Sequence, residues 1–574
     1  MARAKKPVAP AQKKTVRTPP DKASCVKLFK EIVSSDTISF IFTDSCKEKE
    51  MIHHPILVNG EWREASFPVS SFRAINPVTA RTLPDSFPVS SFLDLDEMLQ
   101  AEENSRAAIE AITFEQRSEF LTTLAAKLRQ NSEELCQTAS AETGLPNSFL
   151  LDHEITQMQQ QLLDAARFCL DRSWCNITID SRNNIRSMRA ALTGPVVIFG
   201  PACNPFSLNS CGGNDFACAI AAGNSVIAKS NPVYPLTSLK LAQLIHEAAN
   251  ALSFPGAFFQ FFFHTTADLG YRLVSHPMLG ALAFTGSRKA GMSLKESADH
   301  SGNQAFINMT GMNPVVILPG AVAGQKTEVA RKLIDAVLLN EGQTCTRPGL
   351  VFIVENKESS GLIRSIVDEF NAGTCRPLLS DLVAHAADSQ VASFLRLGAR
   401  KLTRKEFYQP NPFVYPYTVL HLDLKTWLKQ AAQFQEEVFG PVIMFVTLEN
   451  DAQFTEALKP LDACNSLSIF AGSSESDDNI LKTVAALLRR KSARLLFDRL
   501  PAQRVASQAL VAGGGFPASN HPECTFSGMP AAITRFTRMQ CHDGFKQTHL
   551  PDDLRNDNAS PGILKLVDGK YISQ

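Results

Sequence analysis

The stretch Gly194-Pro-Val-Val-Ile-Phe-Gly-Pro-Ala-Cys-Asn204 decides the fold. Its apolar run, Val196–Phe199, is short and ends at a Gly-Pro pair, which favours a strand of a parallel sheet buried on both faces. Gly200 and Pro201 turn the chain immediately after this run, and the polar residue Asn204 follows. The sequence thus predicts a buried strand whose carboxyl end carries a polar side chain.

Downstream of this strand the pattern alternates between strand-like and helical segments. The strand-like runs are Ser225–Lys229, Phe258–Phe263 and Leu282–Thr285, and the helical stretches are 212–222, 236–251 and 266–275. Such alternation predicts βαβ units and a parallel α/β sheet. Ligands of doubly wound sheets bind at the carboxyl ends of the strands. In this chain those ends carry Asn204, Lys229 and the pair Gly286-Ser287.

The flanking regions complete a two-lobed α/β prediction. Helical periodicity covers 94–145 and again 149–171, and a second alternating region begins with Val315–Leu318 and includes Gly349–Val354. We expect a dinucleotide-binding domain at 51–314, a catalytic domain at 315–490, and a segment at 491–574 that returns to the first domain and supports oligomer contacts. The first 20 residues are basic and rich in proline, which predicts a disordered basic extension over 1–50.

Composition limits the possible partners. Among 574 residues, 57 are Lys or Arg and 57 are Asp or Glu, so no overall field attracts nucleic acid or an anionic membrane. No apolar run is long enough to span a bilayer. The 13 cysteines lack the spacing of a zinc site or a disulfide framework. We expect a cytoplasmic protein with no metal, no nucleic-acid partner and no membrane partner.

Cys345 is the candidate nucleophile. It lies in the run Asn340-Glu-Gly-Gln-Thr-Cys345-Thr-Arg-Pro-Gly349, after a helix-like stretch at 326–340. A glycine shortly before a cysteine lets the backbone turn tightly and bring N–H groups toward the sulfur, which suits a thiolate nucleophile and a developing oxyanion.

Conventional cofactor motifs are absent from the sequence. It has no Gly-x-Gly-x-x-Gly fingerprint after the first strand, no phosphate-binding loop with Gly-Lys-Ser/Thr and no His-Glu-x-x-His helix. In their place, Lys229 stands at a strand end where a cation could meet a ribose hydroxyl or a 2′-phosphate. Gly286 and Ser287 open the next helix, whose N–H groups favour a pyrophosphate.

A series of motifs carries a resemblance to a known family. Phe-Gly-Pro-Ala-Cys-Asn204, Val-Ile-Ala-Lys229, Phe-Thr-Gly-Ser287, Gly-Gln-Thr-Cys345 and Glu-Glu437-Val-Phe439-Gly-Pro occur in this order. Together they resemble the aldehyde dehydrogenase superfamily over roughly residues 56–545. The sequence around these motifs is similar to that of the branch that oxidises 2-oxoglutarate semialdehyde with NADP.

The resemblance implies roles for these residues. Cys345 would attack the aldehyde, and Asn204 with the backbone N–H of Cys345 would hold the oxyanion. The cofactor-binding residues would be Lys229 and Glu437 for the riboses, Gly286 and Ser287 for the diphosphate, and Phe439 for the nicotinamide. NAD-preferring relatives carry a glutamate where this chain has Pro232, so NADP is expected and NAD stays possible. The family also implies a homodimer or homotetramer.

One position departs from the family pattern. Asn308 stands where the family has its general base, a glutamate, and an amide cannot accept a proton. Thioester hydrolysis should be slow, because a base is usually worth about 100 to 10,000-fold in rate. Three interpretations remain open: another base, with Glu341 as the nearest candidate in sequence; a thiol acceptor such as coenzyme A; or an impaired paralogue that acts as a binding protein.

Two weaker predictions concern charged side chains. Arg347, immediately past the nucleophile, has the bidentate geometry to bind a substrate carboxylate. The polar cluster Asp152, His153 and Glu154 is expected to face solvent, as is the carboxylate of Glu341.

Overall fold

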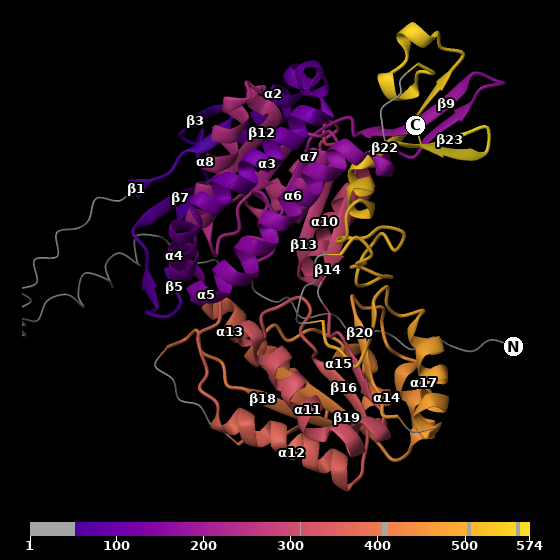
Figure 1. Cartoon of the computed structure of the whole chain (residues 1–574). Coiled ribbons are helices and arrows are strands. Elements are labelled where there is room, and N and C mark those ends of the chain that lie inside the picture. The colour runs from indigo at the N-terminus through magenta and orange to yellow at the C-terminus, as the bar shows by residue number, and fades with distance from the viewer. Residues whose placement is uncertain are drawn as a thin grey trace, which may run out of the picture. The chain divides into compact units, whose positions relative to one another are not determined.

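The computed structural model describes residues 52–309, 311–404, 411–473, 475–501, 507–557 and 563–573. The extension predicted at 1–50 lies outside these residues. The described part of the chain contains two seven-stranded sheets and one five-stranded sheet, with helices packed around the first two (Figure 1).

The first large sheet has the predicted parallel core. Its strand order is β14-β13-β10-β11-β12-β2-β3. The parallel strands are β10 (Val196–Phe199), β11 (Val226–Lys229), β12 (Phe259–Phe262), β13 (Ala281–Gly286) and β14 (Gln304–Met309), and β2 (Ile56–Val58) and β3 (Glu61–Arg63) add an antiparallel edge. All residues of β10 and β12 are buried. The sheet is thus covered on both faces, as the apolar runs predict.

The helices between these strands also match the alternating pattern. They are α7 (Asn214–Ala221), α8 (Pro235–Ala251), α9 (Ala267–Val274) and α10 (Arg288–Ser301). The helical region predicted at 94–145 is divided into α2 (Phe92–Glu110), α3 (Phe114–Gln130) and α4 (Ser132–Thr143). Thr113 caps α3 with a reciprocal capping box, so the chain stops and restarts the helix there.

The second large sheet is also mostly parallel. Its order is β17-β18-β19-β16-β15-β20-β21. The strands are β15 (Val315–Ile317), β16 (Leu350–Val354), β17 (Arg400–Lys401), β18 (Thr418–Asp423), β19 (Val442–Leu448), β20 (Leu467–Phe470) and β21 (Leu495–Phe497), and the helices include α11 (Pro319–Leu338), α12 (Lys357–Ala372), α13 (Asp381–Arg396) and α17 (Glu475–Leu488). The helix α11 and strand β16 flank the loop that carries Cys345.

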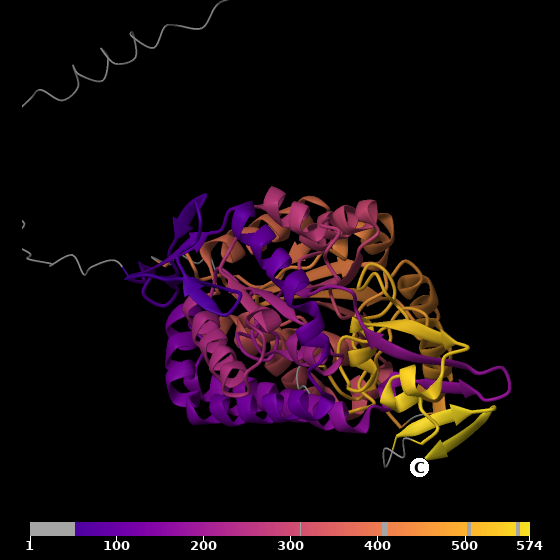
Figure 2. The ribbon, with the colours of Figure 1, turned by 90° about the horizontal axis from the view of Figure 1, so that it is seen from above.

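The last part of the chain contacts two other regions. Strand β22 (Thr537–Asp543) pairs with β9 (Ile185–Ala191) in a five-stranded sheet, where the two lie side by side in Figure 2. The same sheet contains β8 (Ile177–Asp180), β23 (Leu564–Val567) and β24 (Lys570–Ser573). Before β22, Ser519 forms an antiparallel bridge with Asn308, and the Met309 N–H donates to the Ala518 carbonyl at 2.8 Å.

The described helices include none that combines the length and the apolar character needed to cross a membrane.

Candidate active site

Three of the five residues predicted to bind cofactor, Lys229, Gly286 and Ser287, lie at the carboxyl edge of the first sheet, whereas Glu437 and Phe439 precede β19 of the second sheet. Phe199 at the end of β10 is in register with Lys229 on one side and with Phe284 on the other. Thr285 in β13 is in register with Asn308 in β14. The strand ends predicted from separate parts of the sequence therefore lie along one edge.

Lys229 presents a partly buried cation at this edge. Its Nζ donates to the Ser230 carbonyl at 2.9 Å and lies 5.4 Å from the centre of the Phe199 ring. Burial lowers the pKa of Lys229 to about 8. Burial, and to a lesser extent the Lys229 ammonium group, lowers the pKa of His264 to about 4. No carboxylate within the described residues forms an ion pair with Lys229, so its charge is available to an anionic or hydroxyl-bearing ligand.

Ser287 begins a helix at the same edge. It is the N-cap of α10, and its side chain accepts a hydrogen bond from the Ala290 N–H at 3.4 Å. Gly286, the last residue of β13, packs against the Phe284 ring, since a β-carbon there would lie 2.7 Å from that ring. The N-terminus of α10 thus lies at this edge of the sheet, and the N–H groups of a helix N-terminus suit a diphosphate.

Asn204 is buried beyond the end of β10, and its amide is held by a glutamate. Its backbone has φ of 61°, in the left-handed region. The Nδ2 atom donates to Glu154 Oε1 at 2.7 Å. The prediction that 152–154 is a solvated cluster is wrong for Glu154, which is 2% exposed. The cause is a π-helical turn at Leu150–Ile155, which precedes α6 (Thr156–Asp171) and changes the face on which side chains emerge.

The loop before Cys345 makes the tight turn predicted from its glycine. Asn340, Glu341 and Gly342 have φ of 50°, 55° and 72°. A β-carbon on Gly342 would lie 2.1 Å from the Gly440 carbonyl oxygen, so only glycine fits there. This contact joins the Cys345 loop to the turn that carries Glu437 and Phe439.

Asn313 fixes the Cys345 loop, and the sequence reasoning missed it. Its Nδ2 donates to the carbonyl oxygens of Cys345 at 3.0 Å and Arg347 at 3.1 Å. Its Oδ1 accepts from Ser466 Oγ at 2.9 Å. Asn313 has φ of 43° and follows shortly after Asn308 in the same crossing segment. The sequence signal that could have identified Asn313 is the Asn-Pro pair that it forms with Pro314 at the end of that segment.

Arg347 does not face a substrate, and the prediction that it binds a carboxylate is wrong. It is 1% exposed. Its Nη2 donates to the Val438 carbonyl at 2.7 Å, and its Nη1 donates to the carbonyls of Pro348 and Val442. Burial lowers the pKa of Arg347 to about 10, an effect that the nearby Glu437 carboxylate opposes. Arg347 therefore ties the Cys345 loop to the Glu437–Phe439 turn.

Glu341 is also buried, contrary to the expectation of a solvated carboxylate. Its Oε1 accepts from Arg376 Nε at 2.9 Å and from the Tyr417 hydroxyl at 3.3 Å. Its Oε2 accepts from the Arg376 N–H at 3.3 Å. Both carboxylate oxygens of Glu341 are already engaged by Arg376 or Tyr417, so the structure gives no support to Glu341 as the replacement base.

Asn308 is half-buried at the end of β14. Its Oδ1 atom is buried and makes no hydrogen bond within the described residues. The bridge to Ser519 holds its backbone in place. Position 308, where the sequence resemblance predicts a base, thus presents a buried amide oxygen that accepts no hydrogen bond from the described residues.

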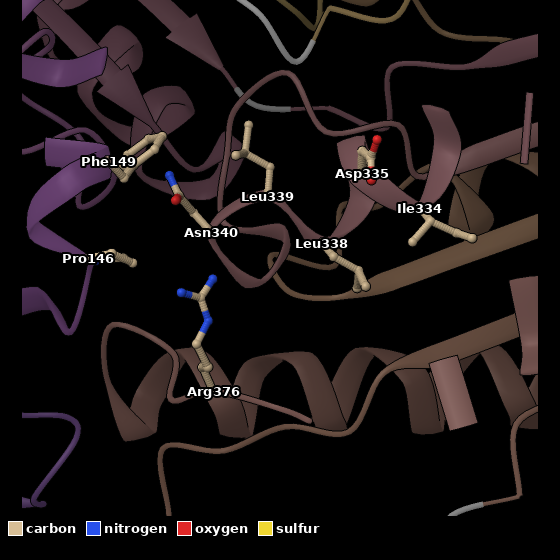
Figure 3. Close-up of a pocket in the computed structure, with 8 residues that line it drawn as sticks. All are labelled: Pro146, Phe149, Ile334, Asp335, Leu338, Leu339, Asn340 and Arg376. Carbon is tan, nitrogen blue, oxygen red and sulfur yellow. The ribbon is translucent and has the colours of Figure 1, made fainter. Parts of the chain in front are cut away.

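A cavity of about 370 Å³ adjoins the Cys345 loop. Figure 3 shows Leu339 and Asn340 from that loop opposite Phe149, with the Arg376 guanidinium pointing toward Asn340 and Pro146. The remaining lining residues, Ile334, Asp335 and Leu338, come from α11. None of the predicted site residues lines this cavity.

Several cysteines are chemically unsuited to the role predicted for Cys345. Burial raises the pKa of Cys136 to about 11 and the pKa values of Cys169, Cys218 and Cys464 to about 12. A thiol with such a pKa is almost fully protonated at neutral pH and is a weak nucleophile. These four cysteines serve as core residues.

Comparison with known proteins identifies the family. The sequence profile of the aldehyde dehydrogenase family matches residues 62–486. The chain belongs to the aldehyde dehydrogenase family. It is an NAD(P)-dependent aldehyde dehydrogenase with the α/β fold of that family.

Two similar aldehyde dehydrogenases are named for one substrate. Alpha-ketoglutaric semialdehyde dehydrogenase from Acinetobacter baylyi is 27% identical over 524 residues, which cover 89% of this chain and 97% of the relative. Alpha-ketoglutaric semialdehyde dehydrogenase 2 from Azospirillum brasilense is 29% identical over 496 residues, which cover 84% and 93%.

Solved aldehyde dehydrogenase structures share the fold. A variant of aldehyde dehydrogenase C from Pseudomonas syringae in complex with NAD+ and octanal has a TM-score of 0.72 and 18% identity, covering 87% of this chain and 98% of its own. The NADP-dependent glyceraldehyde-3-phosphate dehydrogenase from Bacillus halodurans, complexed with NADP, has a TM-score of 0.70 and 18% identity, covering 86% and 99%.

Proposed function

We propose that this aldehyde dehydrogenase oxidises 2-oxoglutarate semialdehyde, or a similar short semialdehyde, with NADP through a thioester on Cys345. The observation that carries the proposal is the way the Cys345 loop is held: Asn313 binds its backbone and Arg347 binds the neighbouring turn. Such a loop keeps one thiol in a fixed place, which a covalent step requires. The two relatives named for alpha-ketoglutaric semialdehyde support the choice of substrate.

The residues present fit a dinucleotide with a 2′-phosphate. Lys229 supplies a cation without a carboxylate partner within the described residues, and Ser287 opens the N-terminus of a long helix. Pro232 stands where the resemblance implies a glutamate in NAD-preferring relatives, so this position carries no carboxylate. A 2′-phosphate would meet no like charge from that residue, which favours NADP over NAD.

The proposed reaction begins at the thiolate of Cys345. The Cys345 thiolate attacks the aldehyde carbon, forming the C–S bond, while the carbonyl oxygen becomes an alkoxide held by Asn204 Nδ2 and the Cys345 N–H. Lys229, Ser287, Glu437 and Phe439 would hold the dinucleotide, which when bound would supply the acceptor for the hydride that leaves this carbon. The product on the enzyme is a thioester, and water must then lose a proton to attack it.

Asn308 makes this last step slow. Its amide cannot take the proton from water, and Glu341 is held by Arg376. A thiol acceptor such as coenzyme A remains the second candidate, because a thiol is partly ionised at neutral pH and needs less help from a base. The third candidate is a binding protein that keeps the cofactor site and has lost turnover.

We expect a homodimer or homotetramer in the cytoplasm. The five-stranded sheet formed by β9, β22 and their neighbours is the surface to which we assign subunit contacts. Analytical ultracentrifugation of the purified protein tests this assignment, and a monomer at micromolar concentration would contradict it.

Rapid mixing tests the function. Enzyme is mixed with NADP and 2-oxoglutarate semialdehyde, with and without coenzyme A, and NADPH is followed by absorbance. A burst of NADPH equal to the enzyme concentration, followed by slow turnover, supports a thioester with slow hydrolysis. Resumption on adding coenzyme A identifies the acylating reaction instead, and the absence of any burst favours the binding protein.

A further inference from the structure

Glu154 is buried next to the residue assigned to the oxyanion. It is 2% exposed and lies in the π-helical turn that precedes α6. Single π-helical turns occur frequently at functional sites, because the added residue changes the direction of a side chain without ending the helix. In this turn Leu151, Asp152 and His153 are exposed, whereas Glu154 points inward.

Every partner of Glu154 is a hydrogen-bond donor. Oε1 accepts from Asn204 Nδ2 at 2.7 Å, and Oε2 accepts from the N–H groups of Phe206 at 3.3 Å and Ser207 at 3.1 Å. The Ser207 hydroxyl reaches both oxygens at 3.0 and 3.1 Å. The carboxyl group therefore acts only as an acceptor, and it selects which end of the Asn204 amide faces it.

The selection matters because an asparagine amide has two unlike ends. Rotation by 180° exchanges the NH2 donor with the oxygen acceptor at little steric cost. With Nδ2 held by Glu154, its second N–H stays available as a donor, and Oδ1 is buried without a hydrogen-bond partner within the described residues. The reversed amide would bring its oxygen lone pairs to the position of that donor and repel an alkoxide.

We propose that Glu154 is a positioning residue that locks the Asn204 amide in the orientation that donates to the oxyanion. This inference rests on the proposed function, since it needs Asn204 to contact the substrate oxygen. In this proposal the effect of Glu154 passes through its one hydrogen bond with Asn204.

Glu142 offers a matched control. It is 1% exposed and accepts from the N–H groups of Leu236 at 2.8 Å and Thr237 at 2.9 Å, and from the Thr237 hydroxyl at 2.6 Å. Glu154 likewise accepts from two successive backbone N–H groups and from the hydroxyl of the second of those residues. It differs from Glu142 in also accepting from the Asn204 amide. The comparison of the two glutamates isolates that amide.

The sharpest variant is Glu154→Gln. One carboxyl oxygen becomes an NH2 group, and the two N–H groups of Phe206 and Ser207 require the remaining oxygen on their side. The NH2 group then faces Asn204 and forces its amide to reverse. We expect the rate of the NADPH burst to fall by about 100 to 1,000-fold, the range set by losing an oxyanion donor. Glu142→Gln should keep the burst rate within about twofold.

A double-mutant cycle shows whether the effect passes through Asn204. In an Asn204→Ala background, Glu154→Gln should change the burst rate by less than about twofold, because the amide it acts on is gone. The NADPH dissociation constant, measured by fluorescence, should stay within about twofold in all variants. Glu154→Ala provides a second comparison with Glu142→Ala should either glutamine variant fold poorly.

The outcomes separate the two proposals. A wild-type burst that Glu154→Gln leaves intact overturns the role of Glu154 alone, as does an equal loss in Glu142→Gln. An undiminished effect of Glu154→Gln in the Asn204→Ala background also overturns it, because the residue then acts by another route. The absence of a burst in the wild-type enzyme overturns the proposed function together with this inference.

Discussion

Replacing Arg347 by methionine tests how the site is held together. The variant keeps an unbranched apolar side chain and removes the guanidinium, which donates to the Val438 carbonyl at 2.7 Å, to the Pro348 carbonyl at 3.3 Å and to the Val442 carbonyl. A hydrogen bond to a charged group is worth about 1.5–3 kcal/mol. Burial lowers the pKa of Arg347 to about 10, because a buried cation is unfavourable. The variant avoids that cost, which offsets part of the lost hydrogen-bond energy.

We expect the Arg347→Met variant to lose about 3–5 kcal/mol of stability, because it removes several hydrogen bonds from a charged donor while also removing the cost of burying that charge. The thermal midpoint should fall on the order of 5 °C by differential scanning calorimetry. Because Arg347 also binds the turn of Glu437 and Phe439, the NADPH dissociation constant should rise by at least about tenfold. Fluorescence titration with NADPH measures it.

The control is Arg376→Met, which removes a half-exposed arginine paired with Glu341. The hydrogen bonds of Arg376 go to Glu341, so NADPH affinity should stay within about twofold. An Arg347→Met enzyme with an unchanged thermal midpoint and unchanged NADPH affinity, but a raised KM for 2-oxoglutarate semialdehyde, would refute this reasoning. That result would return Arg347 to the role of a carboxylate partner.

Three further predictions concern other parts of the molecule. Asn308→Glu should raise steady-state hydrolytic turnover by about 100-fold or more, with the NADPH burst unchanged, and an unaltered steady-state rate would show that this position does not limit hydrolysis. Burial lowers the pKa of Lys229 to about 8, so the ammonium loses its charge as the pH rises. NADPH should therefore bind about tenfold more weakly at pH 9 than at pH 7. In Lys229→Met the NADPH dissociation constant should no longer change with pH over this range. Burial raises the pKa of Glu142 to about 7, so the contribution of this group to folding is full below pH 4.5 and falls by about 3 kcal/mol as the pH rises through 7. The thermal midpoint should therefore depend less steeply on pH in Glu142→Gln than in the wild type. An equal pH dependence in the two proteins would contradict the assignment.

The first sheet could be predicted because local and global signals agree. Val196–Phe199 is apolar at every position, and all four residues are buried in a central strand. The same reasoning places the Lys229 and Gly286 strand ends correctly. Buried parallel strands leave a strong pattern in sequence, because neither face tolerates polar residues.

The orientation of single side chains could not be predicted in the same way. Helical periodicity over 149–171 assumes one regular phase, and the π-helical turn at Leu150–Ile155 changes that phase and buries Glu154. Glu341 lies within a tight turn and Arg347 follows it, and the direction of that turn depends on distant segments. Their partners, Val438 and Arg376, are too far along the chain for local patterns to reveal them.

Covalent chemistry at Cys345 is the central claim, and mass spectrometry tests it most directly. The enzyme is mixed with NADP and 2-oxoglutarate semialdehyde, quenched in acid during the burst, digested and sequenced. We predict an acyl adduct on Cys345 in an amount equal to the NADPH formed, and neither adduct nor NADPH in Cys345→Ser. A full NADPH burst in Cys345→Ser, or a wild-type burst with no adduct on Cys345, would contradict the account.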